Sequence, residues 1–286
     1  MSHAIIIPIY CENRNTIILC NELQNFGAEH IVVVNDGLNP KSEYFNELTS
    51  IGCHLVHLKN NNGKGASLKA GIKYAHDNLY NITGYITCDA DGQHTANDVM
   101  KISRMLDLRN GSLILGKRDY KKSKMPINIR IGNRLSSAYF KVITGKSCRD
   151  TQTGLRGIPA FLYDTVMKTK GSRFDFEMNF LTKCADMRVP FYFVNIIADC
   201  SNCSSNFRLI KDTYLIYRTP LRFATASIGC TIIDLVLFTI FAYILPSHMF
   251  FNIMLATLMA RVVSGGINFL INRKVIFGNT DNGAKQ

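Results

Sequence analysis

The sequence predicts an α/β fold with a mostly parallel sheet, followed by a C-terminal hairpin of two apolar helices. Two observations lead to this prediction. In residues 1–116, short apolar runs rich in Ile and Val alternate with amphipathic stretches of helical period, which is typical of a sheet covered by helices. After residue 222, two stretches of 23 residues contain one charged side chain each. The chain is 47% hydrophobic and 19% charged, a balance that excludes intrinsic disorder.

Five strands and three helices are expected in the first part of the chain, because short Ile- and Val-rich runs predict strands and the longer stretches between them predict helices. The expected strands are residues 4–9, 30–35, 54–58, 84–88 and 112–116, and the expected helices lie near residues 15–26, 66–77 and 97–108. Ligands of such sheets gather at the carboxyl ends of the strands. Polar groups follow three of these ends: Tyr10 and Glu12, Asn35 and Asp36, and Asp89 and Asp91.

The two apolar stretches have the length of membrane spans. Residues 223–245 contain only Asp234 as a charge, and residues 249–271 contain only Arg261. At about 1.5 Å per residue each stretch reaches roughly 35 Å, enough for the ~30 Å hydrocarbon core of a bilayer. Residues 246–248 predict a short turn between them, so that the pair forms a hairpin.

Basic side chains flank this hairpin on both sides. Arg218 and Arg222 precede the first span, and Arg273 and Lys274 follow the second. Because cytoplasmic loops carry an excess of basic residues, the large N-terminal part and both termini are expected in the cytoplasm, next to a cytoplasmic membrane crossed twice. The predicted organisation is an α/β domain over residues 1–206, an interfacial linker helix over 207–221, the transmembrane hairpin over 222–277 and a flexible tail over 278–286.

Most of the net charge of +12 comes from one region. Residues 101–150 hold 13 basic and three acidic side chains, whereas residues 1–100 are net acidic. Such a block suits an anionic partner: nucleic acid, a phosphorylated substrate or an acidic membrane surface. Within it, residues 126–146 mix apolar and basic side chains as in a helix that lies on a bilayer, and a core helix with a solvated basic face is the other interpretation. The two spans favour the membrane and argue against nucleic acid.

Asp89 and Asp91 form the most specific motif of the chain. They stand one residue apart after an apolar strand, in the run DADGQH at residues 89–94. Two carboxylates so placed can hold a hard divalent cation, Mg²⁺ or Mn²⁺, which in turn bridges phosphate oxygens. An Asp-rich turn without a ligand is the structural alternative. The strand context and the polar groups at the neighbouring strand ends favour the metal site.

Two further segments have the chemistry of phosphate binding. Residues 60–65, NNNGKG, precede a predicted helix and place Lys64 beside backbone amides, although their spacing is not that of a nucleoside triphosphatase loop. Residues 150–156, DTQTGLR, carry more polar groups than an ordinary strand edge, and an ordinary turn is the alternative. Together with the strand ends, these segments predict a nucleotide and phosphate site.

Six segments occur in order along residues 3–215, namely PIYCEN (8–13), VNDG (34–37), NGKG (62–65), DADGQH (89–94), GKRDY (116–120) and DTQTGLR (150–156). Together they resemble glycosyltransferase family 2, and within it the polyprenyl-phosphate glycosyltransferases of the dolichol-phosphate mannose synthase type. This resemblance implies a GT-A fold, which is Rossmann-like. It also implies membrane-bound, inverting transfer of a sugar from a UDP- or GDP-sugar to a polyprenyl phosphate, for cell-envelope glycan or glycoconjugate modification.

The resemblance also implies roles for individual residues. The residues implied to bind the donor nucleotide-sugar are Pro8, Tyr10, Glu12, Asn35, Asp36, Lys64, Asp89 and Ala90. Those implied to hold Mg²⁺ or Mn²⁺ on the leaving diphosphate are Asp89, Asp91 and Gln93, and the catalytic residues are Asp89, Asp91 and Arg118. The acceptor phosphate is assigned to Arg118, Arg130, Arg134 and Arg156, because guanidinium groups match phosphate oxygens. Arg156 can serve either phosphate.

Two positions depart from the family pattern. The family usually has Asp-Asp-Gly-Ser where this chain has NDGL at residues 35–38, which removes one charge at the nucleoside. It has Gly-Ser-Arg where this chain has GKR at residues 116–118, and the extra lysine strengthens anion binding.

The C-terminal hairpin resembles half of a GtrA-like domain. Residues 222–223, Asp234 and residues 268–273 match the first two of its usual four helices. Small residues recur at every fourth position of the second span, at Ala256, Ala260 and Ser264. Asp234 and Arg261 are expected to pair at matching depth, within one hairpin or between two copies of the chain, and contact with the lipid phosphate or a translocation path is the functional alternative. Two hairpins are expected to associate, so the chain is predicted to be a homo-oligomer.

Other functions remain as alternatives. Processive polysaccharide synthases of the superfamily have a Gln-x-x-Arg-Trp motif, and this chain has no Trp, which excludes them. Transfer to a protein or a soluble glycan differs from the main prediction in its acceptor. The non-enzymatic alternative is a membrane scaffold or a lipid-carrier flippase component with a degenerate transferase domain, and the intact Asp89 and Asp91 argue against it.

Overall fold

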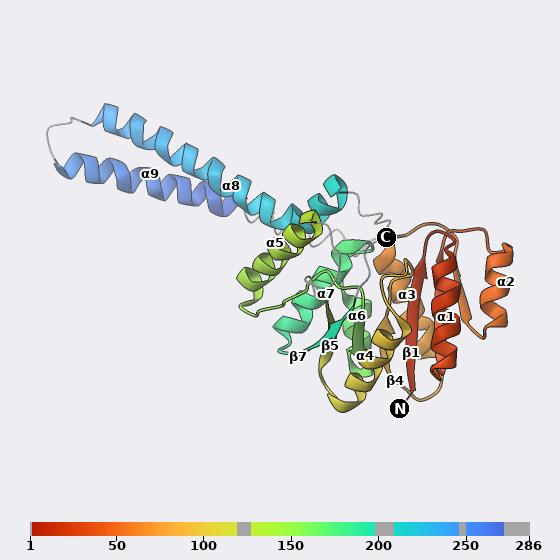
Figure 1. The fold of residues 1–286 in the computed structure, drawn as a ribbon. Coiled ribbons are helices and arrows are strands. Elements are labelled where there is room, and N and C mark those ends of the chain that lie inside the picture. The colour runs from red at the N-terminus through yellow and green to blue at the C-terminus, as the bar shows by residue number, and fades with distance from the viewer. Residues whose placement is uncertain (1, 119–126, 198–208, 246–249, 272–286) are drawn as a thin grey trace. The chain divides into compact units, whose positions relative to one another are not determined.

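The computed structural model describes residues 2–118, 127–197, 209–245 and 250–271, and the chain divides into two compact units, Met1–Phe207 and Arg208–Gln286. The elements of the first unit are β1 (Ser2–Ile9), α1 (Arg14–Asn25), β2 (His30–Asp36), α2 (Glu43–Ser50), β3 (His54–Leu58), α3 (Lys64–Asn78), β4 (Ile82–Thr87), α4 (Ala96–Leu108), β5 (Leu113–Arg118), α5 (Ile127–Thr144), β6 (Arg156–Pro159), the 3-10 turn η1 (Ala160–Leu162), α6 (Tyr163–Lys168), α7 (Phe174–Asp186) and β7 (Phe191–Ile196) (Figure 1). Those of the second unit are α8 (Leu209–Ile244) and α9 (Phe250–Ile271).

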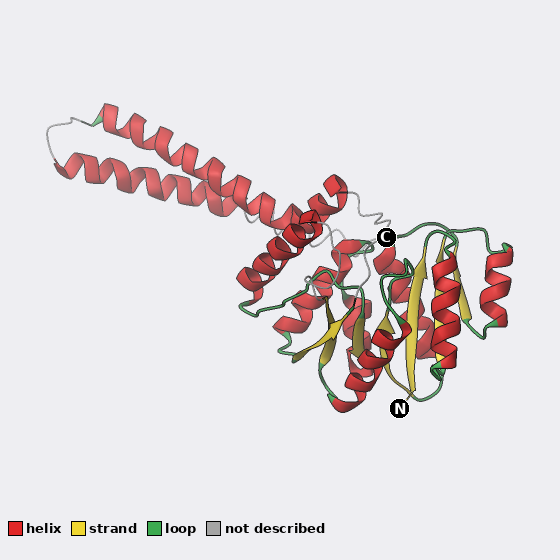
Figure 2. Cartoon of the chain, viewed as in Figure 1, coloured by secondary structure: helices red, strands yellow, loops and turns green. Residues whose placement is uncertain are grey.

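The strands of the first unit form one seven-stranded sheet in the order β3-β2-β1-β4-β6-β5-β7. Figure 2 shows the strands in yellow with helices around them. β1 pairs in parallel with β2 and β4, β2 pairs in parallel with β3, and β5 pairs in parallel with β7. Among the described strands β6 alone is antiparallel, inserted between β4 and β5. The predicted mostly parallel sheet is confirmed, and the predicted elements of residues 1–116 agree with the structure within two residues.

Strand β1 is apolar from Ala4 to Ile9 because both of its faces are buried. Ile5, Ile7 and Ile9 pack on one face of the sheet with residues of α1, α2 and α4, whereas Ala4 and Ile6 pack on the other face with residues of α3 and α7. All five side chains are at most 2% exposed. A strand that is buried on both faces reads as an unbroken run of Ile and Val instead of an alternating pattern, and its polar groups are left to the strand ends.

In the second unit, α8 and α9 lie side by side (Figure 1). Helix α8 runs without a break through residues 221 and 222, so that the predicted linker helix and the first predicted span belong to one helix. Ala256, Ala260 and Ser264 are buried where α9 meets α8. The small-residue face is thus used inside the hairpin.

By length and composition, Ser227–Ile244 is long and apolar enough to cross a membrane, and within the described ranges no other helix meets both criteria. The second predicted span, over residues 249–271, is therefore present as a helix, but its crossing of a membrane is not shown. The predicted turn at residues 246–248 and the tail over 278–286 lie outside the described residues.

Candidate active site

The loop after β4 is held in place by the start of α1. The backbone N–H of Cys88 donates to the carbonyl of Ile6 at 3.0 Å, which extends the pairing of β4 with β1 by one residue. The Thr16 hydroxyl then donates to the carbonyl of Ala90 at 3.0 Å. Ala90, one of the residues assigned to the donor, thus fixes the loop through its backbone and leaves the carboxylates of its neighbours to other contacts.

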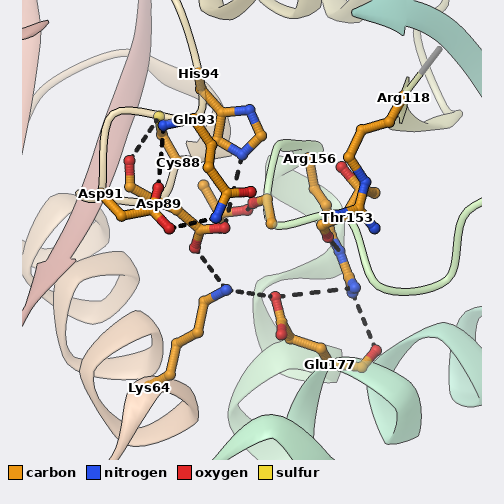
Figure 3. A network of polar contacts seen from close by, with 12 residues as sticks. Lys64, Cys88, Asp89, Asp91, Gln93, His94, Arg118, Thr153, Arg156 and Glu177 are labelled. Atoms are coloured by element: carbon orange, nitrogen blue, oxygen red, sulfur yellow. Dashed lines mark hydrogen bonds and ion pairs between the residues drawn. The ribbon is translucent and has the colours of Figure 1, made fainter. Parts of the chain in front are cut away.

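Asp89 lies between a lysine and a histidine. Its Oδ1 is 2.6 Å from Lys64 Nζ, and its Oδ2 is 3.6 Å from Nε2 of the buried His94 (Figure 3). Burial acts to raise the pKa of Asp89, but the Lys64 ammonium and His94 outweigh it and hold this pKa well below its usual range. Asp89 is therefore a carboxylate, available to a cation at neutral pH.

Gly154 explains why the 150–156 segment belongs to the same site. The Thr87 hydroxyl donates to the carbonyl of Gly154 at 2.7 Å, and a Cβ atom on Gly154 would stand 2.0 Å from Asp89 Oδ2. Real Cβ atoms do not approach so closely. Glycine is required here because the backbone lies directly against the Asp89 carboxylate, and this contact fixes the direction in which the carboxylate faces.

Asp91 accepts hydrogen bonds from its own loop. The backbone N–H of Gln93 donates to Asp91 Oδ1 at 3.1 Å, and the Gln93 side-chain amide donates to Asp91 Oδ2. Burial, followed by the charge of Asp89, raises the pKa of Asp91. A raised pKa of this origin marks negative charge that the protein leaves uncompensated.

This donor set fits a hard divalent cation. Asp89, Asp91 and Gln93 offer carboxylate and amide oxygens on one short loop, the ligand type that Mg²⁺ and Mn²⁺ prefer, and a cation there would relieve the repulsion between the two carboxylates. The described residues contain no group of three or more His, Cys, Asp or Glu that could hold a metal. The amide oxygen of Gln93 and the oxygens of a ligand would therefore have to complete the coordination.

The polar contacts continue from Asp89 into the protein. Lys64, the first residue of α3, also lies 3.2 Å from Oε1 of Glu177 in the first turn of α7. Burial acts to lower the pKa of Lys64, but Asp89 and Glu177 outweigh it and the pKa is raised, so this lysine is an ammonium. Glu177 is a functional candidate that the motifs did not reveal, because it stands within an ordinary helical segment far from them in sequence.

Arg156, assigned to either phosphate, lies in the interior. It is 2% exposed, and its guanidinium donates to the carbonyls of Thr153 at 2.9 Å, Glu177 at 3.0 Å and Thr151 at 3.1 Å. Its Nη2 is also 3.9 Å from Glu177 Oε1. In this conformation Arg156 connects the 150–156 segment to α7. Its guanidinium is buried and does not face solvent.

Arg118 makes a paired contact with Asp150. Its Nε and Nη2 each lie 2.8 Å from a different oxygen of the Asp150 carboxylate, and both side chains are buried. The two other arginines assigned to the acceptor, Arg130 and Arg134, lie on α5 and are exposed. Neighbouring apolar side chains of α5 are exposed as well: Ile127 by 76%, Ile131 by 53% and Leu135 by 60%.

Asn35 and Asp36, both assigned to the nucleoside, are nearly fully buried, at 1% and 4% exposed. Asn35 Oδ1 accepts a hydrogen bond from the backbone N–H of Leu38 at 2.7 Å. The Asp36 carboxylate accepts from the backbone N–H groups of Asn62 at 2.8 Å and Gly63 at 2.9 Å. In this conformation both side chains shape the loops around the site instead of facing its open edge.

The residues assigned at the end of β1 differ in their exposure. Pro8 is buried in the strand, whereas Tyr10 is 38% exposed and Glu12 is exposed. Burial, followed by the charges of Cys11 and Asp91, raises the pKa of Tyr10 to about 12, so its phenol is a hydrogen-bond donor beside the carboxylates. Glu12 lines an open recess together with Arg14 and other side chains of α1 and α2.

Comparisons with known proteins agree with this geometry. Residues 4–164, more than half of the chain, match the family described as Glycosyl transferase family 2. A protein of Methanocaldococcus jannaschii with no assigned function is 32% identical over 188 residues, which cover 62% of this chain and 73% of that protein. The UDP-N-acetylglucosamine–dolichyl-phosphate N-acetylglucosaminyltransferase of Methanococcus voltae is 28% identical over 172 residues, which cover 53% of this chain and 67% of that enzyme.

Solved structures of the same fold are also similar. Glucosyl-3-phosphoglycerate synthase from Mycobacterium tuberculosis, in complex with Mn²⁺ and UDP-glucose, matches with a TM-score of 0.57 and 12% identity over 77% of each chain. This likeness shows the fold, and it confirms the GT-A architecture that the motifs implied. With the family match over residues 4–164, the first unit and its strand-end carboxylates lead to one conclusion: this chain belongs to glycosyltransferase family 2 and is a glycosyltransferase.

Proposed function

We propose that the protein is a membrane-bound, inverting glycosyltransferase that moves a sugar from a UDP- or GDP-sugar to a polyprenyl phosphate. The observation that carries this proposal is the arrangement at the carboxyl end of β4, where Lys64 lies against Asp89 and Gln93 donates to Asp91. The name of one relative supports the acceptor, because that enzyme transfers N-acetylglucosamine to dolichyl phosphate. The motifs lie in the first unit, where residues 4–164 match the family.

On the donor side, the divalent cation would be held by Asp89, Asp91 and Gln93, and when bound it would supply charge neutralisation at the leaving diphosphate. Lys64 adds a second positive charge, because its Nζ lies 2.6 Å from Asp89 Oδ1. Tyr10, with its protonated phenol, and Glu12 stand at the neighbouring strand end, where the nucleoside would lie. Pro8, Asn35, Asp36 and Ala90 would contribute by shaping the walls of this donor site.

The chemical step requires no strong base from the protein. A phosphate oxygen of the acceptor, already anionic near neutral pH, forms the new bond to the anomeric carbon while the bond from that carbon to the diphosphate oxygen breaks. The nucleoside diphosphate leaves, and the configuration is inverted. Catalysis then rests on alignment and on stabilising the charge that develops on the leaving group.

The acceptor phosphate would be met by arginines around α5. Arg130 and Arg134 lie on the exposed side of this helix, and Arg118 stands at the end of β5 in its contact with Asp150. We assign the acceptor phosphate to these three residues. Arg156 remains a candidate only if its carbonyl contacts are released in the complex.

Helix α5 would also face the lipid. Ile127, Ile131 and Leu135 follow one another at helical spacing, and all three are more than half exposed, beside two arginines. Apolar side chains with flanking positive charge are the pattern of a helix that lies on an anionic bilayer. Replacing Ile131 and Leu135 by Gln should raise the KM for polyprenyl phosphate in vesicles, while Gln at Ile18, an exposed isoleucine of α1, should leave it unchanged. Equal KM values would remove this role.

We place the protein in the cytoplasmic membrane with two spans and with its catalytic domain and both termini in the cytoplasm. The candidate span Ser227–Ile244 and the basic residues that flank the hairpin support this location. Asp234 accepts a hydrogen bond from Ser264 at 2.8 Å and is 3.4 Å from Arg261, whose side chain is 72% exposed. A guanidinium at the bilayer centre costs at least ~2.5–3.5 kcal/mol. We therefore propose that the face of the hairpin that carries Arg261 contacts a second copy of the chain.

The experiment that tests the function uses the full chain in detergent with one polyprenyl phosphate and a panel of UDP- and GDP-sugars. Radiolabelled sugar that becomes extractable into organic solvent, in the presence of Mg²⁺ or Mn²⁺, is the expected result. Label that appears only on a soluble glycan or protein would contradict the lipid acceptor. Absence of both turnover and nucleoside diphosphate binding would favour a membrane scaffold or a flippase component with a degenerate domain.

A further inference from the structure

The contacts around Asp89 form a chain of alternating charge. Asp89, Lys64, Glu177 and Arg156 follow one another, with distances of 2.6 Å, 3.2 Å and 3.9 Å between their charged atoms (Figure 3). The chain begins at the carboxylate assigned to the metal and ends in the interior. Lys64 is thus placed between two carboxylates, of which only Asp89 belongs to the DADGQH motif.

The spacing of Lys64 and Glu177 is fixed by the backbone. The N–H of Ala66 in the first turn of α3 donates to the carbonyl of Ser172, just before α7, at 2.9 Å. A Cβ on Gly65 would stand 2.5 Å from the Cβ of Phe176, so the two helix starts touch without a side chain between them. These contacts fix the distance between the backbones that carry Lys64 and Glu177.

Glu177 lies between two basic side chains, Lys64 and Arg156. It is 7% exposed, and it lies in the first turn of α7, where the helix dipole favours a negative charge. Arg156 binds both ends of this residue: it donates to the backbone carbonyl, and its Nη2 lies near the carboxylate. The free-energy cost of burying a carboxylate is much smaller when a cation lies on each side of it than when it is isolated.

We propose that Glu177 is a positioning residue that holds the Lys64 ammonium toward the donor diphosphate. This inference rests on the proposed function. When Asp89 binds a divalent cation, it shares its charge with that cation and holds Lys64 less firmly. Glu177 then keeps the ammonium in place from the protein side, opposite the diphosphate, and is itself placed by Arg156 and by the contact of α3 with α7.

A purely structural role for Glu177 predicts a different outcome. In that case its replacement would lower the stability of the fold, and the affinity of the folded protein for a nucleoside diphosphate would stay the same. If Glu177 acts through Lys64, its replacement weakens nucleoside diphosphate binding, and this effect disappears once Lys64 is absent. A double-mutant cycle separates the two cases.

The cycle consists of the wild type, Glu177→Gln, Lys64→Met and the double variant, each as the full chain in detergent. Binding of UDP, and of GDP where UDP does not bind, is measured by calorimetry at saturating Mg²⁺. We expect Glu177→Gln to weaken binding about tenfold, Lys64→Met to weaken it at least as much, and the double variant to equal Lys64→Met alone. Glu22→Gln, an exposed glutamate of α1, is the matched control and should bind as the wild type does.

Unchanged binding in Glu177→Gln would overturn the proposal, and so would a further tenfold loss when Glu177→Gln is added to Lys64→Met. If Glu177→Gln does not fold, Glu177→Asp carries the test, because it keeps the charge and shortens its reach by one methylene. That variant should bind UDP several-fold more weakly, and wild-type affinity would contradict the proposal. A wild type that binds neither UDP nor GDP would instead refute the proposed function, which keeps the two failures distinct.

Discussion

The ends of β2 and β4 carry the same kind of polar sequence and use it differently. At the end of β2, Asp36 is 4% exposed and gives both oxygens to backbone N–H groups of the loop before α3. At the end of β4, the ion-pair partners of Asp89 are the side chains of Lys64 and His94, and Asp91 accepts from the backbone and side-chain amides of Gln93 in its own loop. The first carboxylate closes a loop, and the second pair stays available to a cation.

This difference teaches what a strand-end carboxylate needs in order to bind a ligand. A buried carboxylate that accepts backbone N–H groups with both oxygens is committed to its loop, and its removal affects the fold. A carboxylate whose partners are mobile side chains can exchange them for a metal or a phosphate-bound cation. The end of β5 is a third case, because the Asp150 carboxylate is paired with two N–H groups of the Arg118 guanidinium, which has further donors for an acceptor phosphate.

The largest expected effect comes from this closed pair at β5. Arg118→Ala leaves the buried Asp150 carboxylate without its cation, and we expect the free energy of unfolding to fall by about 3–5 kcal/mol. Urea denaturation in detergent, followed by circular dichroism, measures it. The double change Arg118→Met with Asp150→Leu should regain most of this stability. If Arg118→Ala is as stable as the wild type, the pair does not hold the end of β5.

The next effect concerns the open end of β4. Asp91→Ala should lower turnover by at least ~10²-fold, because it removes an electrostatic stabiliser of the leaving diphosphate, and the unfolding transition should change little. Sugar transfer at saturating donor and Mg²⁺ gives the rate. Activity at the wild-type level, also in the presence of a chelator, would show that Asp91 holds no metal in catalysis.

A smaller effect, on stability, is expected at the end of β2. Asp36→Ala leaves the N–H groups of Asn62 and Gly63 without their acceptor, and we expect a loss of about 1–3 kcal/mol in the free energy of unfolding. Asp36→Asn keeps an acceptor oxygen and should lose less. The comparison of the two strand ends would fail if Asp36→Ala left stability unchanged and reduced turnover as strongly as Asp91→Ala.

The smallest effect is expected at an exposed ion pair. Arg14 Nη1 lies 2.8 Å from Glu47 Oε2, and the two side chains are 73% and 38% exposed. Such pairs are screened by water and salt, so Arg14→Ala should change the free energy of unfolding by less than about 1 kcal/mol. The same urea titration checks it. A loss as large as that of Asp36→Ala would mean that exposure is a poor guide to the strength of polar contacts in this protein.

The sequence predicts strands β1 to β5 and helices α1, α3 and α4 within two residues. The signal is clearest in β1 and β2, because a strand that is buried on both faces is apolar throughout, whereas the edge strand β3 is only half-buried. Strand β6 was missed because it has four residues, RGIP, with no strand pattern. Its antiparallel insertion between β4 and β5 depends on tertiary pairing. Strand β7, FYFVNI, has the aromatic and β-branched residues that could have revealed it.

The sequence predicts where the candidate site lies in the fold, but only some of the contacts between its side chains. The motifs located Asp89, Asp91 and Lys64, and the structure brings Asp89 and Lys64 together. The direction of the Asp36 and Arg156 side chains could not be predicted, because it depends on which backbone groups the fold leaves unpaired nearby. Glu177 could not be predicted either, since its contact with Lys64 joins helices that are distant in sequence.

Binding of Mn²⁺ to the full chain, followed by electron paramagnetic resonance in the presence of UDP or GDP, tests the central claim most directly. The wild type and Asp36→Asn should each bind one Mn²⁺ per chain, and Asp91→Ala should lose this binding. The same Mn²⁺ binding in Asp91→Ala and the wild type, or its loss in a folded Asp36→Asn protein with Asp91 intact, would contradict the assignment of metal binding to the end of β4.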